Sequence, residues 1–235
     1  MRTIASAACR SAALSLLLLS GAAPAAARPV VVELFTSQSC SSCPPAEALL
    51  GQLAGEGSEI LPLAYHVTYW NHLDWRDTYS LPAATERQHL YAGRLGQAVY
   101  TPQAVIDGRL GLVGSQEEAV RAAIAKARDA AGETVPVSLS GRTSLTVRLG
   151  AGRGTGTVTL IGFDPRHETS VPRGENAGRT LTQYNVVRSV AEIGRWTGVA
   201  QELTVPWPAG EAAAILVQDA DGHIIGAGSS RGGGA

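Results

Sequence analysis

The sequence has little positive charge and only one long apolar run, and both shortages exclude classes of function. Lys126 is the sole lysine among 235 residues, and 19 basic residues stand against 20 acidic ones. Such a chain has no basic patch to hold a phosphate backbone, so we do not expect nucleic acid as a partner. It also has no catalytic-triad motif, phosphate-binding loop or internal repeat. A content of 45% hydrophobic and 17% charged residues is typical of an ordered globular protein.

The apolar run lies at the N-terminus and has the pattern of a secretory signal peptide. Arg2 and Arg10 flank a positive start, the stretch SAALSLLLLSGAA is too short to span a bilayer comfortably, and Ala25–Ala27 offers a small-residue cleavage site. We predict a signal peptide over residues 1–27, cleaved near Ala27, and a mature protein that is periplasmic or secreted. An uncleaved membrane anchor is the alternative. Without the leader, 17 basic residues face 20 acidic ones, a net charge of −3, and no second apolar run could span a membrane.

Two cysteines remain in the mature chain, since Cys9 leaves with the leader. They stand three positions apart in the stretch ELFTSQSCSSCPP. Export would place Cys40 and Cys43 in an oxidising compartment, where a disulfide persists. A bridge that closes so small a loop removes little chain entropy from the unfolded state, so it stabilises a fold poorly. It suits thiol–disulfide exchange, because the second cysteine can release a partner that is bound to the first.

The residues around the pair predict a strand before it and a helix after it. The apolar run that begins at Val30 and ends near Thr36 is typical of a strand buried on both faces. In PPAEALLGQLAG, two prolines suit a first helical turn, the leucines form a stripe, and Glu47 stands where the helix dipole favours an anion. A thiolate at a helix N-terminus has a lowered pKa and is a good nucleophile. The two prolines leave open whether the helix begins before or after Cys43.

Strands and helices alternate through the rest of the first half. We predict a strand in EILPLAYHV, a helix over residues 83–95, a hairpin turning at Asp107-Gly108 and a helix after Ser115. The order β-α-β-α-β-β-α, with the dithiol after the first strand, is the layout of thioredoxin.

Residues 30–131 resemble a thioredoxin-fold domain with a Cys-Ser-Ser-Cys motif. The stretches ELFTSQSCSSCPPAE, HVTYWNHLDWRD, YTPQAVIDG and GENAGRTLTQYNVVRS are similar to an exported bacterial family catalogued as a domain of unknown function, over essentially the whole mature chain. The resemblance implies a cis-proline beside the dithiol, for which Pro102 after Thr101 is the candidate. It also implies that an acid on the first strand, here Glu33, assists proton transfer at the resolving cysteine. Alternatively, Glu33 faces solvent or pairs with an arginine such as Arg109.

After Gly132 the sequence alternates polar and apolar residues between glycine-rich breaks, as successive antiparallel strands do. We therefore expect an α/β thioredoxin-like fold (βαβαββα) over residues 28–132, followed by a small antiparallel β-sandwich domain over residues 134–230. The long polar loop RHETSVPRGENAGRT would either bind over the dithiol or form a flexible hairpin tip.

Three distant segments are expected to meet beside the dithiol. The carboxyl ends of parallel strands share one edge of a sheet, which would bring the segment that follows His66 close to the end of the first strand. That segment concentrates aromatic residues and histidines, and His66 and Trp70, together with Thr101, are candidates for substrate contact. In the alternative, the aromatic residues only shield the sheet and the histidines are satisfied polar groups.

These observations favour an exported thiol–disulfide oxidoreductase that acts on protein thiols or disulfides or on a redox partner protein. Cys40 would be the nucleophile, Cys43 the resolving thiol and Pro102 a shaping element, with no cofactor besides the disulfide. This interpretation expects the sulfur atoms to be accessible. The alternative is a copper or other soft-metal protein that uses Cys40, Cys43 and His66 or His72. A third interpretation is a binding module whose disulfide is only structural.

Overall fold

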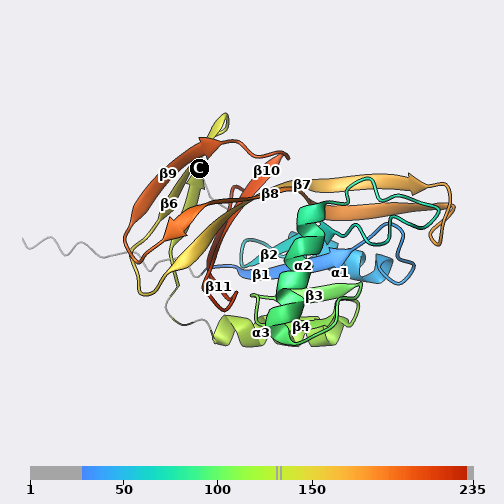
Figure 1. Cartoon of the computed structure of the whole chain (residues 1–235), viewed down its shortest axis with the longest axis horizontal. Helices are drawn as coiled ribbons and strands as arrows, with labels where there is room; N and C mark the ends of the chain where they lie inside the picture. The colour runs from blue at the N-terminus through green and yellow to red at the C-terminus, as the bar shows by residue number, and fades with distance from the viewer. Residues whose placement is uncertain (1–27, 131, 133, 232–235) are drawn as a thin grey trace, which may run out of the picture.

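The computed structural model describes residues 28–130, 132 and 134–231 (Figure 1). The predicted signal peptide, residues 1–27, lies outside the described residues. Within the described part of the chain, no helix is both long and apolar enough to cross a membrane.

The first half of the chain forms strands and helices in the order β-α-β-α-β-β-α. They are β1 (Val30–Thr36), α1 (Pro44–Gly55), β2 (Ile60–His66), α2 (Pro82–Leu95), β3 (Gln103–Ile106), β4 (Leu110–Val113) and α3 (Glu117–Asp129). β1 pairs in parallel with β2 and antiparallel with β3, so the ends of β1 and β2 and the beginning of β3 lie at one edge. The turn after β3 places Asp107 and Gly108 at φ angles of 50° and 68°, as the Asp-Gly pair predicts.

The described residues from 134 onward form strands joined by turns and loops. These are β5 (Val137–Ser140), β6 (Ser144–Leu149), β7 (Gly156–Val171), β8 (Arg179–Trp196), β9 (Gln201–Pro206), β10 (Ala212–Gln218) and β11 (Ile224–Ser229). β7 and β8 pair along almost their whole length as a long antiparallel hairpin. This hairpin extends from the region of β6 and β9 past α2 to the end of the molecule near α1 (Figure 1).

The predicted fold, a thioredoxin-like domain followed by a small β-sandwich, is wrong. Strands from both halves form one mixed eight-stranded sheet in the order β11-β10-β7-β8-β2-β1-β3-β4, and β5, β6 and β9 form a separate three-stranded sheet. The halves meet where β8 runs parallel to β2, with Ala64 opposite Val186. The side-chain amide of Asn185 also donates a hydrogen bond to the Pro62 carbonyl oxygen at 2.8 Å. Every residue of β2 is buried, so this strand needs a partner at its second edge, and the long hairpin supplies one.

The two faces of the central strands belong to different apolar clusters. On one face, Val32 and Leu34 of β1 pack with Leu50 of α1 and with residues of α3. On the other face, Phe35 and its neighbours pack with Phe163 of β7, so this cluster joins both halves of the chain. A third cluster lies between the three-stranded sheet and strands of the large sheet. Because side chains alternate along a strand, successive residues of β1 pack into different clusters.

Helix α1 also packs directly against β8. Gly51 lies where the ring of Tyr184 comes so close that a Cβ atom at this position would collide with it. A groove of about 430 Å³ runs between the two elements and is lined by Pro44, Glu47 and Thr182, among others. The second half of the chain thus reaches the helix that follows the two cysteines.

Candidate functional site

Cys40 and Cys43 form a disulfide at the junction between β1 and α1. Cys43 is the N-cap residue of α1, and Pro44 and Pro45 occupy the first helical turn. The helix therefore begins after both cysteines, which settles the question that the two prolines left open. The backbone of Cys43 takes part in the helix through its carbonyl oxygen, which accepts hydrogen bonds from the N–H groups of Ala46 and Glu47.

The disulfide is buried, and the expectation of accessible sulfur atoms is wrong for this state of the protein. Cys40 is 1% exposed and Cys43 is 0% exposed, whereas Ser41 and Ser42 between them are exposed. A thiol of another protein could not reach either sulfur atom without a local movement. The parts of the chain that lie against the disulfide loop are therefore part of the site.

One of these parts is the end of the β7–β8 hairpin, residues 172–178, which we name the hairpin tip. The side-chain amide of Asn176 donates hydrogen bonds to the carbonyl oxygens of Gln38 and Cys40, at 2.9 and 3.0 Å. The carboxylate of Glu175 accepts a hydrogen bond from the Ser41 N–H at 3.1 Å. The polar loop is thus the tip of a hairpin, and its Glu175 and Asn176 also bind the backbone around Cys40, so it combines features of both alternatives.

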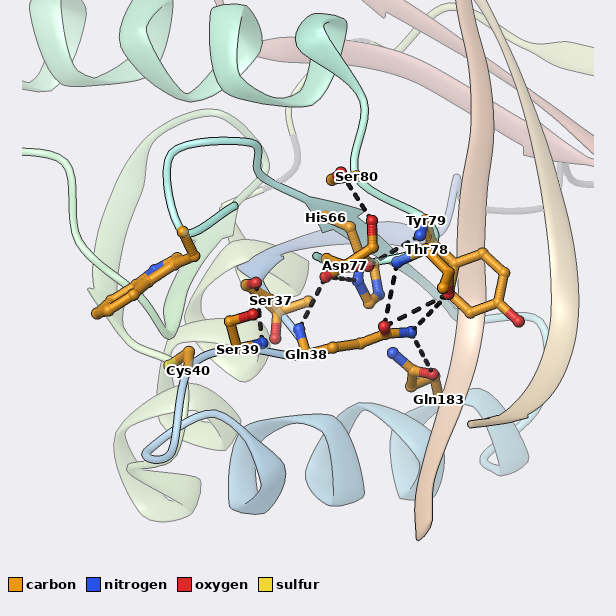
Figure 2. A network of polar contacts seen from close by, with 12 residues as sticks. Ser37, Gln38, Ser39, Cys40, His66, Asp77, Thr78, Tyr79, Ser80 and Gln183 are labelled. Carbon is orange, nitrogen blue, oxygen red and sulfur yellow. Dashed lines mark hydrogen bonds and ion pairs between the residues drawn. The ribbon is translucent and has the colours of Figure 1, made fainter. Parts of the chain in front are cut away.

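Gln38 holds the residues before Cys40 in place (Figure 2). Its side-chain oxygen accepts hydrogen bonds from the indole N–H of Trp75 and from the Thr78 N–H, at 3.0 and 3.1 Å. Its side-chain nitrogen donates to Gln183 of β8 at 3.3 Å. The approach to the disulfide is thus fixed by the segment after β2 and by the long hairpin together.

His66, at the end of β2, is fully buried and paired with Asp77. The distance from His66 Nδ1 to Asp77 Oδ2 is 2.7 Å, and the same carboxylate oxygen accepts the Gln38 N–H at 2.7 Å (Figure 2). Burial lowers the pKa of His66, but the charge and hydrogen bond of Asp77 and the charge of Glu47 outweigh it, so the pKa of His66 is raised. Among the described residues, His66 Nε2 is buried without a hydrogen-bond partner.

Glu47 is the residue of this site whose role the sequence did not suggest. Its side chain is buried in the first turn of α1, and its Oε1 accepts a hydrogen bond from the Thr36 hydroxyl at 2.7 Å. Thr36 is paired with His66 across β1 and β2, so the three side chains share one face of the sheet. Burial raises the pKa of Glu47 to about 7, against the opposing charge of His66 and the hydrogen bond of Thr36. This carboxyl group therefore changes protonation near neutral pH.

Glu33 lies buried on the opposite face of β1 and pairs with an arginine, as one alternative predicted, although this arginine is Arg87 and not Arg109. Its carboxylate accepts hydrogen bonds from Arg87 Nε at 2.5 Å and from Arg87 Nη2 at 3.0 Å. The hydroxyl of Tyr91 donates to the same carboxylate. The structure thus surrounds Glu33 with partners from α2, on the side of the sheet away from α1.

The other predicted contact residues lie near one another. The Thr101–Pro102 peptide bond is cis, as the resemblance implied. The indole N–H of Trp70 donates a hydrogen bond to the Thr101 hydroxyl at 2.8 Å, so these two residues form one unit. His72 is exposed, and its Nδ1 lies 2.7 Å from the carbonyl oxygen of Tyr69.

A possible metal-binding arrangement in the described residues lies far along the chain from the cysteines. Asp219, Asp221 and His223 place one ligand atom each within 4.8 Å of one another in the turn after β10. In the disulfide state, the sulfur atoms of Cys40 and Cys43 are bonded to each other and are not thiolate ligands. The copper alternative with His66 or His72 stays a prediction.

Comparison with known proteins identifies the family. Residues 31–218 match the model of the family described as "Protein of unknown function (DUF1223)". The chain belongs to this family. The predicted resemblance to a family of unknown function is thereby confirmed, and this family description names no activity. No curated protein matches the chain.

Two solved structures are similar to this member of the family. The crystal structure of protein AGR_C_4864 from Agrobacterium tumefaciens is 31% identical, with a TM-score of 0.74, over 85% of this chain and 92% of that chain. HBP35 of Porphyromonas gingivalis is 15% identical, with a TM-score of 0.65, over 86% of this chain and 74% of that chain. The second likeness is one of fold alone.

Two functional candidates, Glu47 and Asn176, were absent from the sequence-based set. A signal for Glu47 was present, because it stands three positions before Leu50 and four after Cys43, on the buried face of the predicted helix. No comparable signal existed for Asn176. It is 136 residues from Cys40 in the sequence, and only the folded chain brings the two together.

Proposed function

We propose that this protein carries out thiol–disulfide exchange with exported proteins through the Cys40–Cys43 pair. The observation that carries the proposal is the disulfide at the junction between β1 and the N-terminus of α1. So small a loop contributes little stability as a staple. A cysteine beside a helix N-terminus, by contrast, has a stabilised thiolate and is a good nucleophile and leaving group.

Starting from the disulfide, the exchange has two steps. A partner thiolate attacks the sulfur of Cys40, a partner–Cys40 bond forms, the Cys40–Cys43 bond breaks, and Cys43 leaves as a thiolate. A second partner thiolate then attacks the partner sulfur, and Cys40 leaves as a thiolate. The partner dithiol loses two electrons and becomes a disulfide, while Cys40 and Cys43 gain the two electrons and become thiols after protonation. The reverse sequence reduces a partner disulfide.

Glu47 supplies the proton that the Cys43 thiolate needs. It lies one helical turn after Cys43, on the same face of α1, and both side chains are buried. With a pKa of about 7, its carboxyl group is partly protonated at neutral pH and can both donate and accept a proton. The groove between α1 and β8 is lined by Glu47, which gives this carboxyl group a route for proton exchange with solvent.

The remaining candidates shape the place where the partner lies. Pro102, Thr101 and Trp70 form the partner-contact surface of the proposal, and His66 is a positioning residue that acts through Glu47. The role of His66 is supported by its charge interaction with Glu47 and by its Nε2 atom, which has no hydrogen-bond partner. The proposal gives no step to Glu33, because its carboxylate is already bound by Arg87 and Tyr91.

The test is the reduction potential of the Cys40–Cys43 pair together with the pKa of Cys40 in the reduced protein. We expect a pKa below the ~8.5 of free cysteine and a disulfide that exchanges with glutathione. Cys43→Ser is the matched variant, because it should accumulate a stable mixed disulfide on Cys40. A pKa of Cys40 at the ordinary value, with no mixed disulfide trapped, would show that the bridge is only structural.

A second candidate function, copper binding by the reduced protein, is favoured by one observation. His66 Nε2 is buried without a hydrogen-bond partner, and one imidazole nitrogen with two thiolates is a ligand set that suits Cu(I). Titration of Cu(I) into the reduced protein and into His66→Ala tests it. Tight binding that is lost in the variant supports this function, and equal binding by both proteins contradicts it.

A further inference from the structure

We propose that the hairpin tip, residues 172–178, is a built-in competitor for the partner of the disulfide, and that this partner is an extended segment of polypeptide. The inference rests on the proposed function, since it names the partner class of the same site. It starts from the polar groups of the disulfide loop that the hairpin tip occupies, which belong to the backbone of Gln38, Cys40 and Ser41.

The hairpin tip binds this backbone with the chemistry of a peptide. The side-chain amide of Asn176 donates two N–H groups to two carbonyl oxygens, and the carboxylate of Glu175 accepts one N–H. A peptide group likewise offers an N–H donor and a carbonyl acceptor. A partner whose sulfur approaches Cys40 must bring its own backbone beside these same groups, so it competes with the hairpin tip for them.

The partner class follows from what the displaced hairpin tip leaves behind. Two buried carbonyl oxygens beside Cys40 and the exposed N–H of Ser41 lose their partners, and the unpaired buried oxygens are the costly groups. An extended chain with free backbone donors and acceptors replaces all three hydrogen bonds. A small thiol compound offers few such groups and gains less from the displacement. The geometry therefore favours an unfolded or loop segment of a protein.

The hairpin tip can be displaced at modest cost. Pro172, Arg173, Glu175 and Ala177 are all exposed, and Asn176 is the buried residue among its members. Gly174 and Gly178 flank the binding residues with φ angles of 83° and 77°, where a glycine backbone is free to change. The body of the hairpin stays bound, because Gln183 of β8 holds Gln38 independently of the hairpin tip. Displacement is therefore a local event with few contacts to break.

The experiment measures how fast thiols attack the disulfide in the full chain. The probes are a short unstructured peptide with one cysteine and, separately, dithiothreitol. Attack on Cys40 releases the Cys43 thiolate, which is trapped with an alkylating reagent and counted by mass spectrometry. Asn176→Ala removes both side-chain donors, and Arg173→Ala, an exposed change in the same hairpin tip, is the control.

We expect Asn176→Ala to speed the attack by the peptide about tenfold, since two hydrogen bonds of the hairpin tip are lost. The gain should be clearly smaller for dithiothreitol, and Arg173→Ala should react as the wild type does. Asn176→Asp is a second variant that keeps the shape of the side chain but turns an acceptor toward the two carbonyl oxygens. It should show the same preference for the peptide, which covers the case in which Asn176→Ala does not fold.

Two results would overturn the inference. Equal acceleration for both probes would show that the hairpin tip only covers the disulfide and does not compete with a peptide. Unchanged rates in both Asn176 variants would show that the hairpin tip has no part in the exchange. Either result leaves the proposed function standing, because the disulfide still reacts. A disulfide that neither probe reduces, in wild type or in the variants, would instead refute the proposed function and the inference with it.

Discussion

Glu33 of β1 and Glu47 of α1 are buried carboxylic acids on opposite faces of the large sheet. The protein groups that replace water around them differ. Glu33 receives hydrogen bonds from Arg87 and Tyr91, which together replace water with a cation and a hydroxyl. Glu47 receives a hydrogen bond from the Thr36 hydroxyl, and its pKa rises to about 7 because burial outweighs it. A buried carboxylate that a cation binds directly by hydrogen bonds is part of the scaffold, whereas one that receives its hydrogen bond from a neutral hydroxyl is able to exchange a proton.

The largest effect is expected when the cationic partner of Glu33 is removed. Arg87→Met should lower the free energy of unfolding by about 4 kcal/mol, because it leaves a buried carboxylate without its compensating charge. Urea unfolding at neutral pH measures the loss. The double variant Glu33→Gln with Arg87→Met is the control, and it should recover most of the stability. A small loss in the single variant would mean that Glu33 is not held as a charged scaffold residue.

The second prediction concerns Glu47 and pH. A raised pKa in the folded state stabilises the fold below the unfolded pKa of 4.5, and this contribution is lost as pH rises through about 7. Glu47→Gln cannot ionise and therefore does not lose this contribution. The free energy of unfolding of the variant minus that of the wild type should be up to about 3 kcal/mol larger above pH 7 than below pH 4.5. Unfolding curves over this range measure the change. A wild-type-minus-variant difference that does not vary with pH would contradict the shifted pKa.

The third prediction sharpens the role of the ion pair beside Glu47. Asp77→Asn removes the larger of the two charges that raise the pKa of His66, so burial should outweigh the remaining charge of Glu47 and the pKa should fall below its ordinary value. The titration of His66 is measured by NMR. The free energy of unfolding should fall by about 2 kcal/mol, more below the His66 pKa than above it, because a buried charged hydrogen bond is lost. An unmoved pKa of His66 would rule out this electrostatic coupling.

The smallest change in the free energy of unfolding is expected for Glu56, a carboxylate that is exposed to solvent. Arg121 forms an ion pair with Glu56 at 2.8 Å, but their side chains are 37% and 40% exposed. Arg121→Ala should change the free energy of unfolding by no more than about 0.5 kcal/mol, and less at high salt. A loss as large as that of Arg87→Met would show that burial is not what separates these carboxylates.

Local features of the sequence predicted the elements around the cysteines. The valine run before the pair, the two prolines after it and the Asp107-Gly108 turn each depend on neighbouring residues, and each forms the expected element. The cis bond before Pro102 came from the resemblance. These are short-range properties, for which a single sequence carries enough information.

The arrangement of the two halves could not be predicted in this way. The alternating pattern of residues 156–196 is the same for a strand in a sandwich and for a strand beside β2, because pairing between distant strands leaves no local mark. Burial of Cys40 and the contacts of Asn176 follow from the same long-range pairing. The resemblance points to Glu33 on β1 as the acid, whereas the structure buries Glu47 on the helix, one turn after Cys43.

The distance in sequence between Cys40 and Asn176 has a consequence for the order in which the site is completed. Synthesis runs from the N-terminus, so both cysteines, β1 and α1 exist before the residues that cover them have been made. The hairpin tip can bind the backbone around Cys40 only after β7 and β8 have been made and paired, so covering of the disulfide depends on a later part of the chain than the bond itself does.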